Sequence, residues 1–402
     1  MTDKEFAWIE ANIAERPEKL RLAVHGRNDG IDYESAITQI ECRRKFATKL
    51  QQTLASFPRF LFPSVLAGEQ ATSDLLADYH TSLTGNYNKV LDLTAGLGID
   101  IFHIAVDATQ ATAVELDHAR AEALKYNAAG LRLDNVDIIE GDCIDYINRC
   151  IADNTYFDAA FIDPARRAID GSRVFALADC EPDIVALLPK VQKICKRLII
   201  KASPMLDITH TVNALSVKPS VIAAVGTPIE CKELLIIIDF DREVEETIIE
   251  AVTLSRDGNS TFSFTRKEEE SAPMPALNAP LKAGDYIYES SPALMKAGAF
   301  KLVASTFGLS VFHPNTRLYY STDAIDGFPG RRYRVVESMP YASKVIKRFK
   351  SKYPRIEVAV RNFGISADNL RAKLGVRDGG SLRLYGYTDS RTEQMLAVVE
   401  HA

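Results

Sequence analysis

Short apolar runs alternate with helix-patterned stretches between residues 89 and 240, and this alternation constrains the fold more than any other feature. The runs are VLDLTAG, ATAVELD, VDIIEGD, FDAAFIDP, RLIIKASP and ELLIIIDF, and stretches such as HARAEALKYNAAG separate them. Strands that alternate with helices are typical of βαβ units, in which helices cover both faces of a parallel sheet. We therefore predict an α/β fold with a doubly wound, mostly parallel sheet.

The remaining regions differ in pattern. With 402 residues, of which 47% are hydrophobic, the chain is long enough for two or three domains with their own cores. Residues 1–80 have helical apolar spacing without strand alternation, so we predict a helical N-terminal domain. We further predict a Rossmann-like domain over residues 81–266 with a hairpin at 246–266, a linker over 267–285, and a small basic α/β domain over 286–402.

Cysteine usage and hydropathy indicate a reducing, aqueous compartment. No apolar run reaches the roughly eighteen residues of a membrane span, and the N-terminal residues are charged and helix-patterned rather than secretory. The six cysteines are scattered without a C-x-x-C pair, which argues against a zinc site and a disulfide framework. We predict a cytoplasmic protein with no metal site and no membrane association.

The loop after the first run holds Gly96 and Gly98, which would let a ligand lie against the backbone. Ligands of open parallel sheets bind at the carboxyl ends of the strands, near the switch point of the strand order. Glu115 ends the second run, where a carboxylate accepts from both hydroxyls of a ribose. Asp142 follows the third run, where it would accept from an adenine amine while Cys143 offers its backbone N–H.

A single acidic residue after a strand is commonly a helix cap or turn residue, but carboxylates at successive strand ends after a G-x-G loop indicate a binding site. No G-K-[ST] follows the loop, so a triphosphate is not expected. The pattern predicts a site for an adenosine.

The runs VLDLTAGLGID, AVELD, EGDC and FDAAFIDPARR together resemble the class I S-adenosylmethionine-dependent methyltransferases over residues 89–204. DPARR, FALADCEPDI and the C-terminal opening YIYESSPALMKAGAF resemble, more narrowly, the bacterial methyltransferases with a THUMP-like C-terminal domain, over nearly the whole chain. The resemblance implies an RNA substrate such as tRNA or rRNA, because THUMP domains bind RNA. It also implies S-adenosylmethionine as cofactor, bound by Asp92, Thr94, Ala95, Gly96, Gly98, Glu115, Asp142 and Cys143.

Chemistry is expected at the fourth run, which ends in IDPARR. Asp163 would accept a hydrogen bond from an exocyclic amine, and the carbonyl of Pro164 would be a second acceptor. Holding the reacting atoms about 3 to 3.5 Å apart supplies roughly 7 to 11 kcal/mol in good intramolecular reactions. We predict methyl transfer to an exocyclic amine of an RNA base, with guanine N2 as the leading candidate from the resemblance.

The sequence departs from the amino-methyltransferase pattern D/N-P-P-Y/F/W at two positions. Ala165 replaces the second proline, and Arg166 replaces the aromatic residue that stacks on the target base. A guanidinium plane also stacks on a base or binds a phosphate, so Arg166 stays a catalytic candidate and Arg167 an RNA contact. The alternative is that Arg166 pairs with an acidic neighbour such as Asp179 or Glu181.

Weaker signals lie beside these positions. Lys201 ends the fifth run, and His80 precedes the first. A solvated lysine and a packed histidine are the commoner interpretations. The segment KASPMLD lacks the cysteine nucleophile of the uridine carbon-5 methyltransferases, so we do not predict that chemistry.

The net charge of −6 conceals a basic segment. Residues 331–391 carry a net +10 and the rest of the chain −16. A basic module on an acidic body is typical of a polyanion-binding appendage, although bases spread over a solvated surface are the alternative. We predict that RNA is bound by Arg331, Arg332, Arg334, Lys347, Arg348 and Lys350.

Two other classes of function stay open. A non-catalytic RNA-binding protein with a vestigial fold is expected to have lost Asp92, Glu115 or Asp142, and all three residues are present. A methyltransferase acting on a protein or a small molecule is favoured if the basic residues scatter instead of gathering on one face with the Asp163 pocket.

Overall fold

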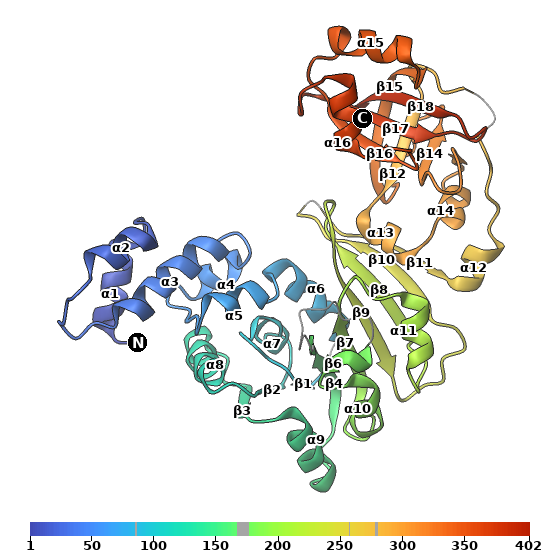
Figure 1. Ribbon diagram of the computed structural model, residues 1–402. Helices are drawn as coiled ribbons and strands as arrows, with labels where there is room; N and C mark the ends of the chain where they lie inside the picture. The colour runs from blue at the N-terminus through green and yellow to red at the C-terminus, as the bar shows by residue number, and fades with distance from the viewer. Residues whose placement is uncertain (85–86, 167–176, 257, 278–279) are drawn as a thin grey trace. The chain divides into compact units, whose positions relative to one another are not determined.

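The computed structural model describes residues 1–84, 87–166, 177–256, 258–277 and 280–402 (Figure 1). They form two compact units. The first unit comprises residues 1–220 and 235–245, and the second comprises residues 221–234 and 246–402.

The first unit begins with a helical region. Its helices are α1 (Asp3–Asn12), α2 (Pro17–Ala23), α3 (Tyr33–Phe46), α4 (Gln51–Ser56), α5 (Val65–Gln70) and α6 (Asp74–Thr84). Polar caps fix where these helices start: Thr2 and Glu5 form a capping box at α1, and Asp32 accepts from the backbone N–H of Ser35 at α3.

A mostly parallel sheet follows the helical region. Its strands are β1 (Lys89–Asp92), β2 (Gln110–Glu115), β3 (Val136–Glu140), β4 (Phe157–Ile162), β7 (Cys195–Ala202) and β9 (Cys231–Asp239), in the order β9-β7-β4-β1-β2-β3. The pairs β1–β2, β2–β3, β1–β4 and β4–β7 are parallel. The connecting helices are α7 (Ile99–Ala105), α8 (His118–Leu131), α9 (Cys143–Ala152), α10 (Ile184–Val191) and α11 (Ile208–Ala214). The predicted α/β fold class is confirmed.

The strand order reverses beside β1, which has β2 on one side and β4 on the other. In such sheets the loops leaving the two central strands diverge to opposite faces and open a crevice. A short two-stranded ladder of β5 (Ala165–Arg166) and β6 (Cys180–Glu181), the latter preceded by the 3-10 turn η1 (Leu177–Asp179), lies after β4 in the chain.

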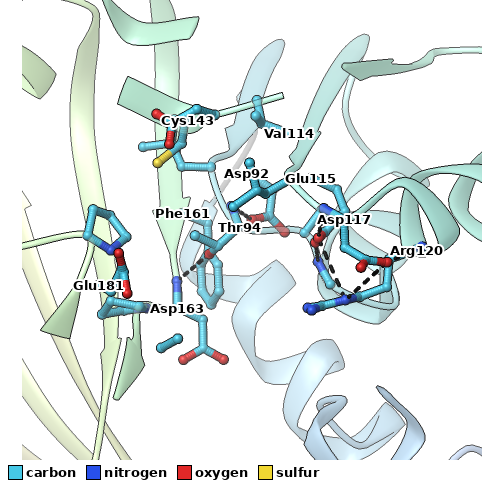
Figure 2. Close-up of a pocket in the computed structure, with 18 of the residues that line it drawn as sticks. Asp92, Thr94, Val114, Glu115, Asp117, Arg120, Cys143, Phe161, Asp163 and Glu181 are labelled. Carbon is cyan, nitrogen blue, oxygen red and sulfur yellow. Dashed lines mark hydrogen bonds and ion pairs between the residues drawn. The ribbon is translucent and has the colours of Figure 1, made fainter. Parts of the chain in front are cut away.

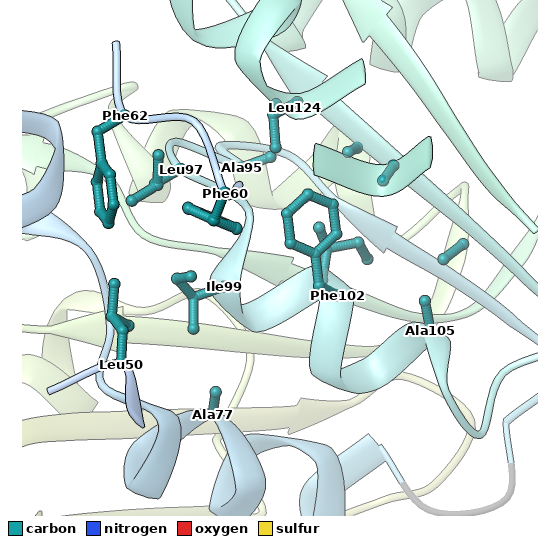
Figure 3. Close-up of a cluster of buried hydrophobic side chains, with 14 of the residues drawn as sticks. Leu50, Phe60, Phe62, Ala77, Ala95, Leu97, Ile99, Phe102, Ala105 and Leu124 are labelled. Atoms are coloured by element: carbon teal, nitrogen blue, oxygen red, sulfur yellow. The ribbon is translucent and has the colours of Figure 1, made fainter. Parts of the chain in front are cut away.

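The helical region and the sheet share one hydrophobic core (Figure 3). Leu50, Phe60 and Phe62 from the helical region pack in the same cluster as Leu97 and Phe102, which follow β1. The rings of Phe60 and Phe102 meet edge to face at 6.4 Å. The helical region is therefore held against the loop that leaves β1.

The second unit contains two sheet segments. In one, β10 (Ile248–Thr253) pairs in parallel with β8 (Val221–Gly226) and antiparallel with β11 (Ser260–Thr265), which is the hairpin that the sequence predicts. The other sheet has the order β13-β14-β12-β15-β18-β17-β16, with β12 (Tyr286–Ser290), β13 (Ser310–Val311), β14 (Leu318–Ser321), β15 (Gly330–Pro340), β16 (Glu357–Arg361), β17 (Leu382–Thr388) and β18 (Gln394–His401).

Helices α13 (Pro292–Ala297), α14 (Lys301–Thr306), α15 (Ser343–Lys352) and α16 (Ala367–Leu374) complete this unit, together with α12 (Arg266–Ser271) inside the stretch predicted to be a linker. Buried Glu269 of α12 accepts from the backbone N–H groups of Phe300, Lys301 and Leu302 at 2.9–3.1 Å. Across the described ranges, no helix is both long and apolar enough to cross a membrane. The cytoplasmic location stays a prediction.

Candidate active site

The carboxyl ends of four strands in the first unit open into one cavity of about 1220 Å³ (Figure 2). Asp92 ends β1, Glu115 ends β2, Asp142 follows β3, and Asp163 follows β4. The cavity is lined by ten of the residues predicted for the site, namely Asp92, Thr94, Ala95, Gly96, Gly98, Glu115, Asp142, Cys143, Asp163 and Pro164.

Thr94 ties the loop after β1 to the end of β4. Its hydroxyl accepts from the backbone N–H of Asp163 at 2.7 Å, and its own N–H donates to Asp92 Oδ1 at 3.0 Å. The loop and the fourth strand end are thereby fixed to each other across the switch point.

Glu115 is a buried carboxylate that braces the glycine loop. Its Oε2 accepts from the backbone N–H of Gly96 and its Oε1 from that of Asp117, both at 2.8 Å, while Arg120 Nε lies 3.7 Å away. A carboxylate offers about four lone-pair positions, so these contacts leave capacity for further donors. Gly96 has φ +58°, and a Cβ there would meet only the carbonyl of Thr94, at 3.9 Å.

Asp142 is the N-cap of α9 and accepts from the backbone N–H groups of Ile144 and Asp145. Capping holds its carboxylate in one position at the cavity edge. Burial raises the pKa of the adjacent Cys143 thiol to about 11, so this cysteine stays protonated and is no nucleophile.

The electrostatics of the cavity floor are set by Asp92, which is 2% exposed. Burial raises the pKa of Asp92 to about 8, with Asp100 and Asp163 adding to the effect, while the Thr94 N–H and Lys201 oppose it. The Asp92 carboxyl therefore holds its proton to a higher pH than a solvent-exposed aspartate does.

Asp163 is held by residues that lie far away in the sequence. Lys201 Nζ, from β7, lies 2.6 Å from Asp163 Oδ2 and 3.0 Å from Thr72 Oγ1. The Thr72 hydroxyl donates to Asp100 Oδ2 at 2.5 Å, and Asp100 Oδ1 lies 2.7 Å from His80 Nδ1. Lys201 is thus a mostly buried ion-pair partner of the cavity residue Asp163 rather than the solvated lysine that the sequence favoured.

The other residues of the DPARR segment are described in part. Pro164 is buried in the cavity wall, and the backbones of Ala165 and Arg166 pair with Glu181 and Cys180. The Arg166 side chain and the whole of Arg167 lie outside the described residues, so the predicted roles of these two residues stay predictions.

Several apolar side chains of the cavity were missed by sequence reasoning, Leu116 and Ile144 among them. Leu116 and Ile144 line it while being 71% and 37% exposed. Leu116 directly follows Glu115, and Ile144 directly follows Cys143. The signal in the sequence was an apolar residue between two polar residues just after a strand. Leu116 and Ile144 can cover the faces of a flat ring.

The predicted RNA-binding residues fall on two elements of the second unit. Arg331, Arg332 and Arg334 lie on β15, and Arg332 and Arg334 face Asp326 and Glu400 at 2.9 and 3.8 Å. Arg331 donates to the carbonyl of Pro228.

Lys347, Arg348 and Lys350 lie exposed on α15, and within the described part of the chain none of these three forms an ion pair within 4.0 Å. The basic charge available to a polyanion is therefore greater on α15 than on β15.

Known proteins resemble this chain along its whole length. A family model for a ferredoxin-like domain matches residues 286–329, and one for a THUMP domain-like fold matches residues 330–401. The crystal structure of a "putative methyltransferase" from Porphyromonas gingivalis W83 is 31% identical, covers 99% of this chain and 98% of that one, and has a TM-score of 0.88. The chain belongs to this methyltransferase family.

The resemblance to the class I methyltransferases with a THUMP-like C-terminal domain is thereby confirmed. An "uncharacterized RNA methyltransferase" of Mycoplasma mobile is 32% identical over 104 residues, which are 26% of this chain and 28% of that protein. The chain thus matches little more than a quarter of the length of this second relative. The C-terminal region that the sequence presents as one domain is matched by two family models.

Proposed function

We propose that the protein transfers a methyl group from S-adenosylmethionine to an exocyclic amine of an RNA base, with guanine N2 of tRNA or rRNA as the leading candidate. The observation that carries the proposal is Asp163, which opens into the same cavity as Glu115, Gly96 and Asp142. A hydrogen-bond acceptor for an amine and an adenosine-type site thus share one space. The Mycoplasma mobile relative, described as an RNA methyltransferase, supports the substrate class.

The residues of the cavity fit the cofactor. Glu115 would accept from the ribose hydroxyls, Asp142 from the adenine amine, and Leu116 and Ile144 would cover the ring. Gly96 leaves room for a ligand against the backbone. When bound, the cofactor supplies an electrophilic methyl group on a sulfonium sulfur.

The chain's own part in the reaction is to position the amine. Asp163 and the Pro164 carbonyl would accept the two amine hydrogens and so aim the nitrogen lone pair. The nitrogen must lose one proton when it gains the methyl group, and the Asp163 carboxylate, 41% exposed, would pass that proton to solvent. Arg166 is proposed to stack on the base or bind a phosphate.

RNA would be held by the second unit. Exposed Lys347, Arg348 and Lys350 offer charge to phosphates, with Arg331, Arg332 and Arg334 as further contacts. The THUMP-like match over residues 330–401 includes all six.

Calorimetric titration with S-adenosylmethionine and S-adenosylhomocysteine tests the cofactor. We expect saturable binding that Asp92→Ala and Glu115→Ala abolish, whereas Asp137→Ala, an exposed carboxylate on β3, should leave it unchanged. Absence of binding by the native chain, alone and with cellular RNA added, would contradict the proposal and favour a non-catalytic RNA-binding protein.

Transfer of a radiolabelled methyl group to cellular RNA tests the reaction. Asp163→Ala should abolish the transfer and leave the affinity for the cofactor unchanged, because Asp163 is proposed to contact only the amine. Retained turnover in that variant would remove Asp163 from the mechanism, and labelling of protein instead of RNA would contradict the substrate class.

A further inference from the structure

Lys201 lies between two acceptors that come from different parts of the first unit, the sheet and the helical region. Its ammonium group bridges Asp163, at the end of β4, and Thr72, which precedes α6 in the helical region. The Lys201 side chain is 15% exposed and that of Asp163 is 41% exposed, so water reaches the ion pair from the Asp163 side.

The partners of Lys201 are themselves fixed. Thr72 donates to Asp100, so its oxygen lone pairs are directed at Lys201. Asp100, 13% exposed, pairs with His80, which has no exposed surface and whose ring lies 5.2 Å from that of Phe161 on β4. The chain of contacts therefore runs from β4 through the helical region and back to β4.

The contacts define the state of Lys201. The Asp163 carboxylate and the Thr72 hydroxyl oxygen both accept from Lys201 Nζ, and a nearby carboxylate favours the ammonium form of a lysine. Lys201 is thus a cation in this site and not a general base.

The cation offsets several acidic groups. Lys201 from β7 faces Asp163, while Asp92 from β1 and Asp100 from α7 lie within electrostatic reach, and Glu181 from β6 lines the same cavity. Burial alone would raise the pKa of Asp100, but His80, Lys201 and Thr72 outweigh it and lower that pKa to about 2. Carboxylates grouped in this way do not all ionise without a cation.

We propose that Lys201 is the positioning residue of the reaction: it keeps the Asp163 carboxylate ionised and in one orientation, so that Asp163 can hold the substrate amine. The proposal rests on the proposed function. It makes the helical region part of the site, since Thr72 holds the lysine that holds Asp163.

Four variants test this role: Lys201→Met, Asp163→Asn, the double variant, and Lys196→Met as control. Lys196 is on the same strand and is 46% exposed, and it pairs with Asp241, which, unlike Asp163, does not line the cavity. We expect Lys201→Met to lower kcat for RNA methylation at least tenfold, which corresponds to about 1.4 kcal/mol, with KM and cofactor affinity within about twofold. Lys196→Met should match the native chain.

The Asp163→Asn background separates positioning from a general structural effect. An amide needs no cation, so Lys201→Met should change kcat less than about threefold in that background. In the single variant Lys201→Met, the acidic limb of the plot of kcat against pH should also move to higher pH, because Asp163 then takes up a proton more readily. Equal losses of kcat in both backgrounds, or an unmoved acidic limb, would overturn the proposal.

Urea unfolding tests the same contact without RNA or cofactor. In Lys201→Met the loss of the cation should raise the pKa of Asp163 in the folded state above that in the unfolded chain, so stability should fall more steeply than in the native chain as pH rises above about 4. The double variant should lose the part of the added slope that comes from Asp163, because an amide does not titrate. If no RNA is methylated but Lys201→Met shows the steeper slope of stability against pH, the proposed function fails while the electrostatic effect of Lys201 on Asp163 is supported. Equal slopes for Lys201→Met and the native chain would overturn that effect.

Discussion

Asp92 is a buried carboxyl group whose pKa is raised in the folded protein. Its pKa is raised from an ordinary 3.8 to about 8 by burial, with Asp100 and Asp163 nearby. The folded state then binds a proton that the unfolded chain releases above about pH 4. This contribution to stability is fully present below about pH 4 and is lost as the pH rises through 8.

We therefore expect the free energy of unfolding of the native chain to fall between pH 5 and 8, by up to about 1.4 kcal/mol per pH unit from this group. Asp92→Asn should remove that dependence, because an amide does not ionise and can still accept from the Thr94 N–H. Urea titrations at several pH values measure it. Exposed Asp137→Asn is the control and should run parallel to the native chain; a parallel curve for Asp92→Asn would contradict the prediction.

At the scale of the element, the loop between β1 and α7 uses its two glycines for different purposes. A Cβ on Gly98, which has φ +86°, would lie 2.3 Å from Leu124 Cδ2 and 2.7 Å from Phe102 Cζ. A Cβ on Gly96 would meet nothing closer than 3.9 Å. Gly98 is thus required by the packing of the loop against α8, and Gly96 by the cavity.

Alanine at each position should separate the two purposes. Gly98→Ala should destabilise by about 2 to 5 kcal/mol, from the left-handed backbone and the overlap with the core. Gly96→Ala should cost about 1 kcal/mol, from the backbone alone, while weakening cofactor binding. Urea unfolding and calorimetry measure the two effects, and equal losses of stability would contradict this assignment.

Helix α15 presents a basic face because its apolar residues gather on the other side. Phe349 is buried, with Val345 and Ile346 packed against the same cluster. Lys347 and Arg348 are one turn from Lys344 and share its face. Such a face offers charge to phosphates without disturbing the core.

Neutral variants of α15 should reveal that charge. We expect Lys347→Gln and Arg348→Gln each to weaken tRNA binding and to reduce the salt dependence of log K by about 1. Lys352→Gln, on the same helix but paired with Glu337 at 2.6 Å, should change the salt dependence of log K less. Anisotropy titrations over a salt series give the slopes, and three identical slopes would exclude α15 as an RNA contact.

At the scale of the whole first unit, the helical region and the sheet share a continuous hydrophobic core, so we expect them to unfold together. Phe60→Ala should therefore destabilise the unit by about 3 to 5 kcal/mol. Leu22→Ala, at an 81% exposed position of α2, should change stability by less than about 0.5 kcal/mol.

The single tryptophan, Trp8 of α1, reports the transition by fluorescence during urea unfolding. If the fluorescence midpoint of Phe60→Ala matched that of the native chain, the helical region would unfold on its own and the shared core would contribute little.

The sequence alone predicted the α/β sheet and the cavity residues that it brings together. Strand and helix periods are local patterns, and parallel strands present their carboxyl ends at one edge, so Asp92, Glu115, Asp142 and Asp163 meet whatever the details of packing. The glycines of the loop after β1 also indicated the site, because the backbone freedom that lets a ligand approach is a property of the residue type.

Only the tertiary structure decided which side chains pair. Lys201 and Thr72 are 129 residues apart, and their contact depends on how the helical region packs against the loop after β1. The same holds for the protonation of Asp92, which follows from burial, and for the pairing of Arg361 with Glu289 across 72 residues. Periodicity places residues on elements, whereas the distance between two side chains is set by the packing of elements that are far apart in the chain.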